Sequence, residues 1–348
     1  MKTEIKQITP LSLAEAKNII ENGGVVAIPT ETVYGLGGNA FDDNAVRKIF
    51  EVKGRPNDNP LIAHVYENYD ISQIIDYDPP YAEKLRKAFL PGPLTLVYPS
   101  TGKVSKYVSC GLHTLAVRVP SHEGAQAFLR EVGVPIVAPS ANISKHVSPT
   151  SATHVWEDFN GKIPLILDGG ECIGGIESTV CDVTGEVPVI LRPGLITAEM
   201  IASVVGECKE YTPKLQAGEK VKSPGLLYKH YSPRCKTQLF SASEKDEALK
   251  KAALERKTGL RVAILCEDEY AKAFEKENLT VLNFGATEAE MASRLYGLLR
   301  EAEKICDVLL AVEPRKTDGV MKGVLNRLRK ACASSDIAHG KDGNIIDK

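Results

Sequence analysis

Short apolar runs, each followed by a polar loop and separated by helical patterns, fill residues 1–206 of the chain. Strands are predicted at residues 25–28, 60–65, 94–98, 115–119, 135–138, 164–167, 179–183 and 187–191. Apolar residues recur at helical spacing at residues 11–22, 44–52, 81–89 and 124–132. Strands interleaved with helices are typical of an α/β domain. We therefore expect an α/β fold with one substantial sheet in this part of the chain.

The pattern changes after residue 206. A chain of 348 residues exceeds one typical core, so two domains are expected. Proline, glycine and lysine accumulate at residues 207–236, which predicts a linker, and its length and its Tyr-Lys-His-Tyr cluster favour a functional one. Residues 237–340 alternate strand and helix patterns and predict a smaller, parallel, Rossmann-like domain. No GxGxxG turn indicates dinucleotide binding there. Residues 341–348 are predicted to be a polar tail.

Composition excludes several classes of protein. A net charge of -2 gives no general affinity for nucleic acid, which needs clustered lysine and arginine. The charged start of the chain lacks the apolar segment of a secretory signal, and no run of 18 apolar residues predicts a membrane helix. The 8 cysteines form no CxxC pair, so a zinc cage and a dithiol redox motif are not expected. These features predict a cytoplasmic protein.

Candidate functional residues lie at the ends of the predicted elements, where open α/β sheets bind ligands. No Walker A loop, HExxH motif or GxSxG elbow occurs in the sequence. The segment PTETVYGLG (residues 29–37) offers threonine hydroxyls for a small polar substrate, and an ordinary turn is the alternative. Lys53 and Arg55 flank a glycine. Two cations this close favour a shared anion such as a polyphosphate, and the alternative is a solvated helix end.

Later strand ends repeat this pattern. His64, considered alone, is typical of a core histidine, whereas Arg118 lies among apolar residues of a strand. That placement indicates either an anionic ligand or a structural salt bridge, with equal weight. Residues 139–150 offer hydroxyls and an amide suited to phosphate or ribose, with an Asn/Ser/Pro turn as the alternative. Residues 175–180 and Arg192 add hydroxyls and another cation. A shared anionic substrate explains the recurrence better than unrelated salt bridges.

Taken together, these motifs resemble one enzyme family. PTETVYGLG, KGRP, RVP, PSAN, ESTV and LRPG occur in the order found in YrdC-type L-threonylcarbamoyladenylate synthases. SPGLLYKHYSP and GVLNRLRKAC resemble the long, two-domain form of that family. The resemblance covers nearly the whole chain. It implies a YrdC-like twisted mixed-sheet domain followed by a smaller Rossmann-like α/β domain.

The resemblance also implies an activity. Such a nucleotidyltransferase converts L-threonine, bicarbonate and ATP into threonylcarbamoyl-adenylate and pyrophosphate. Mg²⁺ is expected as the cofactor, held mainly by the ATP phosphates and not by metal-binding residues of the chain. The implied downstream partner is a tRNA threonylcarbamoyl transferase complex that modifies tRNAs reading ANN codons. Direct binding of tRNA and association with a membrane are not expected.

Site residues are carried over by position from the family's motifs. Lys53 and Arg55 are expected to be catalytic, since they can neutralise the charge that develops as pyrophosphate leaves. Tyr231, in the linker, is expected to close over the nucleotide, and the alternative is that it staples the two domains together. The threonine-binding positions are Thr32, His64, Arg118, Ala138 and Ser178. The ATP-binding positions are Arg55, Asn59, Thr114, Ser140, Asn142, Ser148, Arg192 and Tyr231.

Two other functions stay open at this point. A module that grips double-stranded RNA in a basic concavity is the alternative outside enzymology, although the near-neutral charge and the lack of interleaved aromatic residues count against it. A carbamoyltransferase of the hydrogenase-maturation type contains a related domain, but also acylphosphatase and cysteine-rich zinc segments that this sequence lacks. Salt-dependent RNA affinity without ATP turnover would favour the first alternative.

Overall fold

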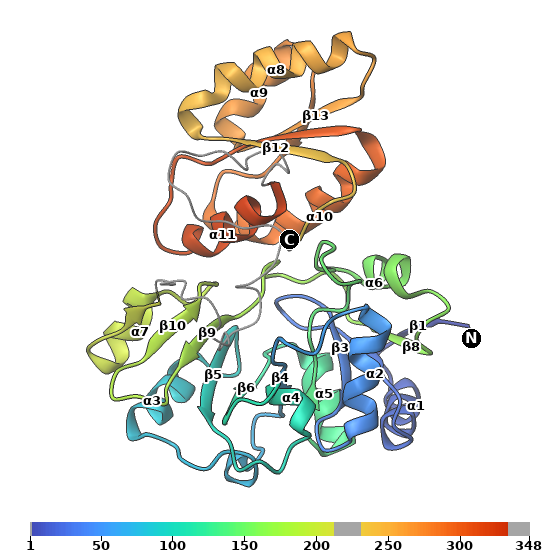
Figure 1. Cartoon of the computed structure of the whole chain (residues 1–348), viewed down its shortest axis with the longest axis vertical. Helices are drawn as coiled ribbons and strands as arrows, with labels where there is room; N and C mark the ends of the chain where they lie inside the picture. The colour runs from blue at the N-terminus through green and yellow to red at the C-terminus, as the bar shows by residue number, and fades with distance from the viewer. Residues whose placement is uncertain (1, 212–230, 333–348) are drawn as a thin grey trace.

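The computed structural model describes residues 2–211 and 231–332 and contains two sheets, one above the other along the long axis of the molecule (Figure 1). The larger sheet has 11 strands in the order β1-β8-β2-β3-β7-β4-β6-β5-β9-β10-β11. Their bounds are β1 Glu4–Gln7, β2 Val26–Ile28, β3 Gly35–Asn39, β4 Ile62–His64, β5 Leu94–Pro99, β6 Thr114–Arg118, β7 Ile136–Val137, β8 Leu165–Asp168, β9 Thr179–Asp182, β10 Val189–Arg192 and β11 Lys209–Glu210. Parallel pairs such as β4–β6 stand beside antiparallel pairs such as β5–β6, so the predicted mixed sheet is confirmed.

One strand lies where the sequence predicted a loop. β3 has the sequence GLGGN, which contains none of the β-branched or aromatic residues that strands favour, yet it pairs with β2 and β7. Close packing of its neighbours explains the glycines. A Cβ on Gly37 would lie 2.8 Å from the Ile136 side chain, so only glycine fits there. The edge strand β1 was also missed, because Ile5 is its single strongly apolar residue.

Helices cover both faces of the large sheet. α1 and α5 pack on one face, where Ile20 and Phe128 are buried against β2 and β8. The helices α2, α3 and α6 bury their apolar sides on the other face. The bounds are α1 Pro10–Glu21, α2 Asp43–Lys53, η1 Ile71–Gln73, α3 Pro80–Phe89, α4 Lys106–Ser109, α5 Glu123–Val132, α6 Ala152–Phe159 and α7 Ala198–Val205.

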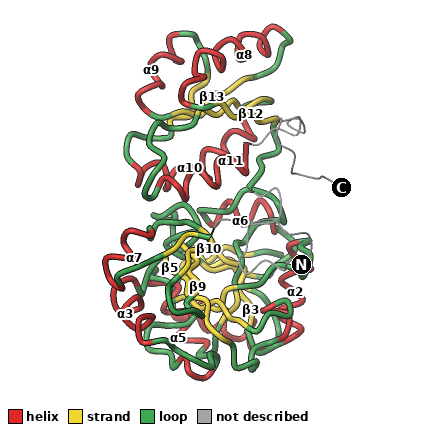
Figure 2. The backbone as a smooth tube through the Cα atoms, turned by 60° about the vertical axis from the view of Figure 1, so that its left-hand side comes forward, coloured by secondary structure: helices red, strands yellow, loops and turns green. Residues whose placement is uncertain are grey.

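The second sheet is the predicted small parallel domain. Its strands run in the order β12-β15-β13-β14, and every pair is parallel. The helices α8 and α9 cover one face, whereas α10 and α11 cover the other and lie toward the first domain (Figures 1 and 2). The bounds are β12 Lys236–Phe240, η2 Ala242–Glu244, α8 Lys245–Lys257, β13 Val262–Cys266, α9 Asp268–Lys276, β14 Thr280–Asn283, α10 Glu288–Ile305, β15 Val308–Val312 and α11 Met321–Cys332.

The predicted linker lies only partly within the described residues. At its start, β11 pairs in parallel with β10 of the large sheet, and at its end β12 begins the second sheet. Tyr228, Lys229 and His230, together with the predicted tail at residues 341–348, lie outside the described residues. Within residues 2–211 and 231–332, no helix has the length and apolar character needed to cross a membrane.

Candidate active site

A pocket opens at the edge of the large sheet that faces the second domain. It collects residues from the loop after β2, the end of α2, the ends of β4, β6 and β10, and the loop after β7. The structure brings together most of the residues that the sequence singled out. Those that line the pocket are Thr32, Lys53, Arg55, Asn59, His64, Arg118, Ala138, Ser140, Asn142, Ser178, Arg192 and Tyr231.

Two predicted ATP-binding residues are not part of the pocket wall. Thr114 begins β6 and pairs with Pro99 of β5. Ser148 is buried, and its hydroxyl donates to the carboxylate of Glu177, 2.7 Å away, which does line the pocket. Ser148 is therefore connected to the wall through Glu177. ATP contact by either residue stays a prediction.

Arg118 has a carboxylate partner inside the protein. Its guanidinium donates to Glu31 Oε1 at 2.6 Å, to Thr32 Oγ1 at 2.8 Å and to the Gly92 carbonyl at 3.2 Å. The salt bridge that the sequence left open therefore exists, and Arg118 also lines the pocket. Glu31 was missed as its partner, although a carboxylate between two threonines at the end of a strand could have suggested it.

Burial and charge set the protonation of this corner of the site. Burial raises the pKa of Glu31, but the charge of Arg118 and its hydrogen bond outweigh burial, so the pKa is lowered overall. Burial, and then the charge of Arg118, lowers the pKa of His64 to about 3. His64 is therefore a neutral imidazole at physiological pH, able to contact a substrate without adding charge.

Three further cations line the pocket, of which Lys53 and Arg192 are buried and Arg55 is half-buried. The ammonium of Lys53 donates to the carbonyls of Ser140 and Asn142 at 2.5 Å and 2.6 Å. The guanidinium of Arg55 donates to the Asn59 carbonyl at 2.9 Å. Lys53 is only 2% exposed, because α2 delivers it into the wall, and the left-handed Gly54 then ends that helix.

Arg192 completes this set at the end of β10. Its Nε and Nη2 donate to the Ser178 carbonyl at 3.2 Å and 2.9 Å. Among the described residues, no carboxylate forms an ion pair with Lys53, Arg55 or Arg192. Burial is the main reason why the pKa of each is lowered, for Arg55 to about 10. Buried cations held by carbonyls, and not by carboxylates, fit an anionic ligand that supplies the missing charge.

Two buried amide oxygens point to a polar ligand as well. The Oδ1 atoms of Asn59 and Asn142 are buried and have no hydrogen-bond partner in the described part of the chain. Both residues line the pocket. Buried acceptors without a donor are rare in native proteins and often mark a ligand or an ordered water. Hydroxyl, amine or water donors of a bound substrate could therefore satisfy them.

Comparisons with known proteins identify the family of this chain. Residues 18–194 match the family model described as telomere recombination, and residues 196–333 match the model described as the threonylcarbamoyl-AMP synthase C-terminal domain. The threonylcarbamoyl-AMP synthase of Pyrococcus abyssi is 42% identical over 322 residues, covering 91% of this chain and 92% of that protein. The Bacillus subtilis enzyme of that name is 41% identical over 324 residues, covering 92% of each. The chain belongs to the threonylcarbamoyl-AMP synthase family.

A solved structure supports the fold of this family member. The crystal structure of Pyrococcus abyssi Sua5 complexed with L-threonine is 40% identical, with a TM-score of 0.86, and the match covers 95% of this chain and 97% of that one. The resemblance seen in the motifs, and the two-domain fold it implied, are thereby confirmed.

In this threonylcarbamoyl-AMP synthase family member, the pocket also contains Tyr231, near the end of the predicted linker. Tyr231 is buried in the wall with a φ of 66°, in the region that favours glycine. Its ring packs against Tyr296 of α10 with centroids 5.4 Å apart, and the next amide, of Ser232, donates to the Lys145 carbonyl at 3.0 Å. Tyr231 thus touches both the pocket and the second domain. Both the closure over a nucleotide and the staple between domains stay open.

The carboxylate in the pocket wall, Glu177, and the one beside it, Glu31, are already engaged. Glu31 is bound by Arg118, and Glu177 is bound by Arg327 of α11 at 3.0 Å. Among residues 2–211 and 231–332, no group of three or more His, Cys, Asp or Glu side chains is placed to hold a metal ion. That a divalent cation enters with a polyphosphate stays a prediction.

Proposed function

We propose that this member of the threonylcarbamoyl-AMP synthase family makes threonylcarbamoyl-adenylate and pyrophosphate from L-threonine, bicarbonate and ATP. One observation carries the proposal: the buried Lys53 and Arg192 and the half-buried Arg55 line one pocket, and none of them forms an ion pair with a carboxylate among the described residues. A triphosphate supplies the charge that these side chains lack. Arg118 and the neutral His64 lie in the same pocket, as an amino-acid substrate requires.

The threonine end of the pocket is formed by hydroxyls and one guanidinium. Arg118 would bind the threonine carboxylate, and Glu31 and Thr32 hold its guanidinium in one orientation. Ser178 lies near them, and its hydroxyl shares a hydrogen bond of 2.8 Å with Thr95. We assign threonine binding to Thr32, His64, Arg118, Ala138 and Ser178. The complex of the Pyrococcus abyssi relative with L-threonine supports this substrate.

The nucleotide end of the pocket contains the other cations. Lys53, Arg55 and Arg192 would neutralise the triphosphate, and the orphaned oxygens of Asn59 and Asn142 would accept hydrogen bonds from bound donors. Mg²⁺ would be held mainly by the phosphates and would help to withdraw charge from the leaving group. We assign ATP binding to Arg55, Asn59, Thr114, Ser140, Asn142, Ser148, Arg192 and Tyr231.

The reaction needs no nucleophile from the protein. The amine of threonine adds to bicarbonate to give a carbamate, with loss of water. A carbamate oxygen then bonds to the α-phosphorus of ATP, and the bond from that phosphorus to the pyrophosphate oxygen breaks. Negative charge grows on the pyrophosphate, where Lys53 and Arg55 can stabilise it. Positioning and electrostatics therefore account for the catalysis, as in other transfers at phosphorus.

The wider role follows from the product. The adenylate is an activated acyl donor, and we propose that a tRNA threonylcarbamoyl transferase complex consumes it in the cytoplasm to modify tRNAs that read ANN codons. Direct binding of tRNA is not part of the proposal, because the net charge is -2.

Pyrophosphate release from ATP tests the proposal directly. The assay compares complete reactions with reactions that omit threonine or bicarbonate, and mass spectrometry identifies the adenylate. We expect release that depends on both co-substrates and on Mg²⁺. Release without threonine would refute the assignment. Salt-dependent binding of double-stranded RNA without any turnover of ATP would instead favour an RNA-binding module.

A further inference from the structure

Two arginines of the second domain reach into the first domain and are fully enclosed. Arg327 of α11 is 0% exposed and Arg300 of α10 is 1% exposed. Neither residue lines the pocket. Each holds a carboxylate of the first domain, at 3.0 Å from Glu177 and at 2.9 Å from Asp158. Buried charges of this kind are costly unless they are paired and hydrogen-bonded, so their partners are fixed in place.

The contact of Arg327 continues to the pocket wall through Glu177. The carboxylate of Glu177 also accepts hydrogen bonds from Ser148 at 2.7 Å and from the Tyr296 hydroxyl at 2.9 Å. Burial raises the pKa of Glu177, but Arg327 and Arg192 outweigh burial and lower it to about 2. Glu177 is therefore an anion, and the next residue, Ser178, receives Arg192 on its carbonyl.

Close backbone packing supports the same wall. A Cβ on Gly175 would lie 2.2 Å from the Ala292 carbonyl of α10, and a Cβ on Gly323 would lie 3.0 Å from Gly194. Arg327 also donates to the Pro193 carbonyl. The loops before β9 and after β10 are thus pressed directly against α10 and α11, with no room for a side chain between them.

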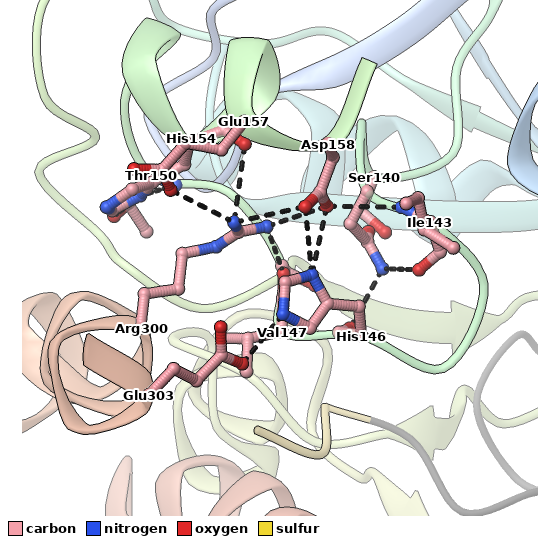
Figure 3. Close-up of polar contacts among 12 residues, drawn as sticks. Ser140, Ile143, His146, Val147, Thr150, His154, Glu157, Asp158, Arg300 and Glu303 are labelled. Carbon is pink, nitrogen blue, oxygen red and sulfur yellow. Dashed lines mark hydrogen bonds and ion pairs between the residues drawn. The ribbon is translucent and has the colours of Figure 1, made fainter. Parts of the chain in front are cut away.

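Arg300 holds the other wall in a comparable way (Figure 3). Its Nη2 donates to Asp158 and to the Val147 carbonyl, at 2.9 Å and 2.6 Å. Asp158 accepts the Ile143 amide at 3.2 Å, and His146 bridges Asp158 to Glu303 of α10 at 3.0 Å and 2.7 Å. These bonds fix the loop after β7.

That loop supplies a cation site of the pocket. Ser140 and Asn142 lie in it, and their carbonyls accept the ammonium of Lys53. The Nδ2 of Asn142 donates in turn to the His146 carbonyl at 2.8 Å. Hydrogen bonds, together with the backbone of this loop, therefore join Arg300 to Lys53, and hydrogen bonds to the neighbouring residues Glu177 and Ser178 join Arg327 to Arg192.

We propose that Arg300 and Arg327 are positioning residues for the reaction. Arg300 holds the loop whose carbonyls accept hydrogen bonds from Lys53, and Arg327 holds the loop whose carbonyl accepts hydrogen bonds from Arg192. The second domain thereby helps to build the pocket. The expected loss of kcat rests on the proposed function, whereas the expected release of the loops does not. Loss of Arg327 would leave Glu177 without its ion pair, and loss of Arg300 would leave Asp158 with His146 as its remaining ion-pair partner, so either change would loosen the adjoining loop. A displaced loop would misplace the cations relative to the reacting phosphorus, where small errors are costly.

The test compares Arg300→Met and Arg327→Met with controls on the same helices. Lys304→Met removes an exposed ion pair of α10 with Glu157 of the first domain, 2.7 Å long. Lys322→Met removes an exposed pair of α11 with Glu210, also 2.7 Å long. Both controls cut an interdomain bridge without touching a pocket loop. Each protein is measured for kcat, for the KM of ATP and threonine, for thermal unfolding, and for hydrogen exchange of residues 142–148 and 174–178.

We expect the arginine variants to lose roughly 10- to 100-fold in kcat at temperatures where they are folded. Arg300→Met should speed exchange in residues 142–148, and Arg327→Met in residues 174–178, whereas the lysine controls change neither. Equal kcat and equal exchange in arginine variants and controls would overturn the inference. If an arginine variant fails to fold, Tyr296→Phe serves as the test, because it removes one of the hydrogen bonds that the Glu177 carboxylate accepts. It should slow kcat by about threefold to tenfold and speed exchange in residues 174–178.

The two proposals fail in different ways. A wild-type protein that releases no pyrophosphate with threonine and bicarbonate would refute the proposed function alone. The exchange measurements would then still decide whether the arginines hold the loops. Active wild type with unaffected arginine variants would refute only the positioning role.

Discussion

Replacing Arg118 by methionine removes a guanidinium that the site uses twice, once to hold Glu31 and once, in our proposal, to bind threonine. The two uses can be separated with the double variant Arg118→Met/Glu31→Gln. The side chains of Arg118 and Glu31 are 4% and 13% exposed, and their ion pair is 2.6 Å long. The single variant leaves a buried carboxylate whose remaining donor is the Ser121 amide at 3.1 Å.

The cost of the single change follows from that geometry. Breaking a buried ion pair by removal of one partner costs about 3–5 kcal/mol, and we expect about 3 kcal/mol because Glu31 keeps some solvent and one hydrogen bond. Burial is the largest single influence on the Glu31 carboxyl, so we expect its pKa to rise above the ordinary value once Arg118 is removed. Stability is then lost as the pH rises through that raised pKa, and the deficit shrinks in acid. The double variant should regain most of the lost stability, since an amide needs no counter-charge.

Threonine binding should respond differently. Both variants lack the charge-assisted hydrogen bonds to the substrate carboxylate, which are worth about 1.5–3 kcal/mol, or roughly 10- to 150-fold in affinity. Denaturant unfolding measures stability, and calorimetry measures threonine and ATP affinity. ATP affinity should change little, because its proposed partners are Lys53, Arg55 and Arg192. A double variant that binds threonine like the wild type would refute the role of Arg118 and leave a purely structural salt bridge.

Three further predictions concern other parts of the pocket. Lys53→Ala and Arg55→Ala should each lower kcat by about 100-fold with less effect on ATP affinity, and losses in affinity at unchanged kcat would show that they only hold the nucleotide. Tyr231→Ala should weaken ATP binding by about tenfold at unchanged interdomain hydrogen exchange, and the reverse pattern would identify it as a staple. Burial lowers the pKa of His146, but hydrogen bonds to Asp158 and Glu303 raise it overall above 6.5. Its stabilisation is therefore lost as the pH rises through that pKa, so His146→Gln should be least different from wild type in alkaline unfolding measurements.

The sequence predicted most of the elements whose burial is periodic or continuous, but it missed the amphipathic helices α6 and α9. Strands such as β4, with every residue buried, and helices such as α5, with a clear apolar side, appear where expected. It also missed β12 and α8. β12 has the half-polar sequence KTQLF, and α8 buries only Ala248 and Ala252 beneath a charged surface. Weakly apolar elements of this kind are stabilised by neighbours that a local pattern does not contain.

The same limit applies to the site. The cations at strand ends could be predicted, because their spacing beside glycines and hydroxyls is local. Their internal partners could not, since Arg118 and Glu31 are 87 positions apart, and Arg327 and Glu177 are 150 positions apart. Only the fold brings such pairs together. The sequence also gave no sign that Arg300 would reach Asp158, 142 positions away.

The structure separates two kinds of buried cation, and the distinction explains why the site is costly to build. Arg118, Arg300 and Arg327 have carboxylate partners inside the protein, so their charges are compensated within the fold. Lys53 and Arg192 instead meet carbonyl dipoles, which orient a charge without cancelling it. Burial therefore works against these cations, as their lowered pKa values show. The paired arginines must hold the walls firmly enough to keep the unpaired cations in place until an anion arrives. Binding of an anion stabilises a pocket built this way, and its cations are already oriented for the negative charge that develops in the reaction.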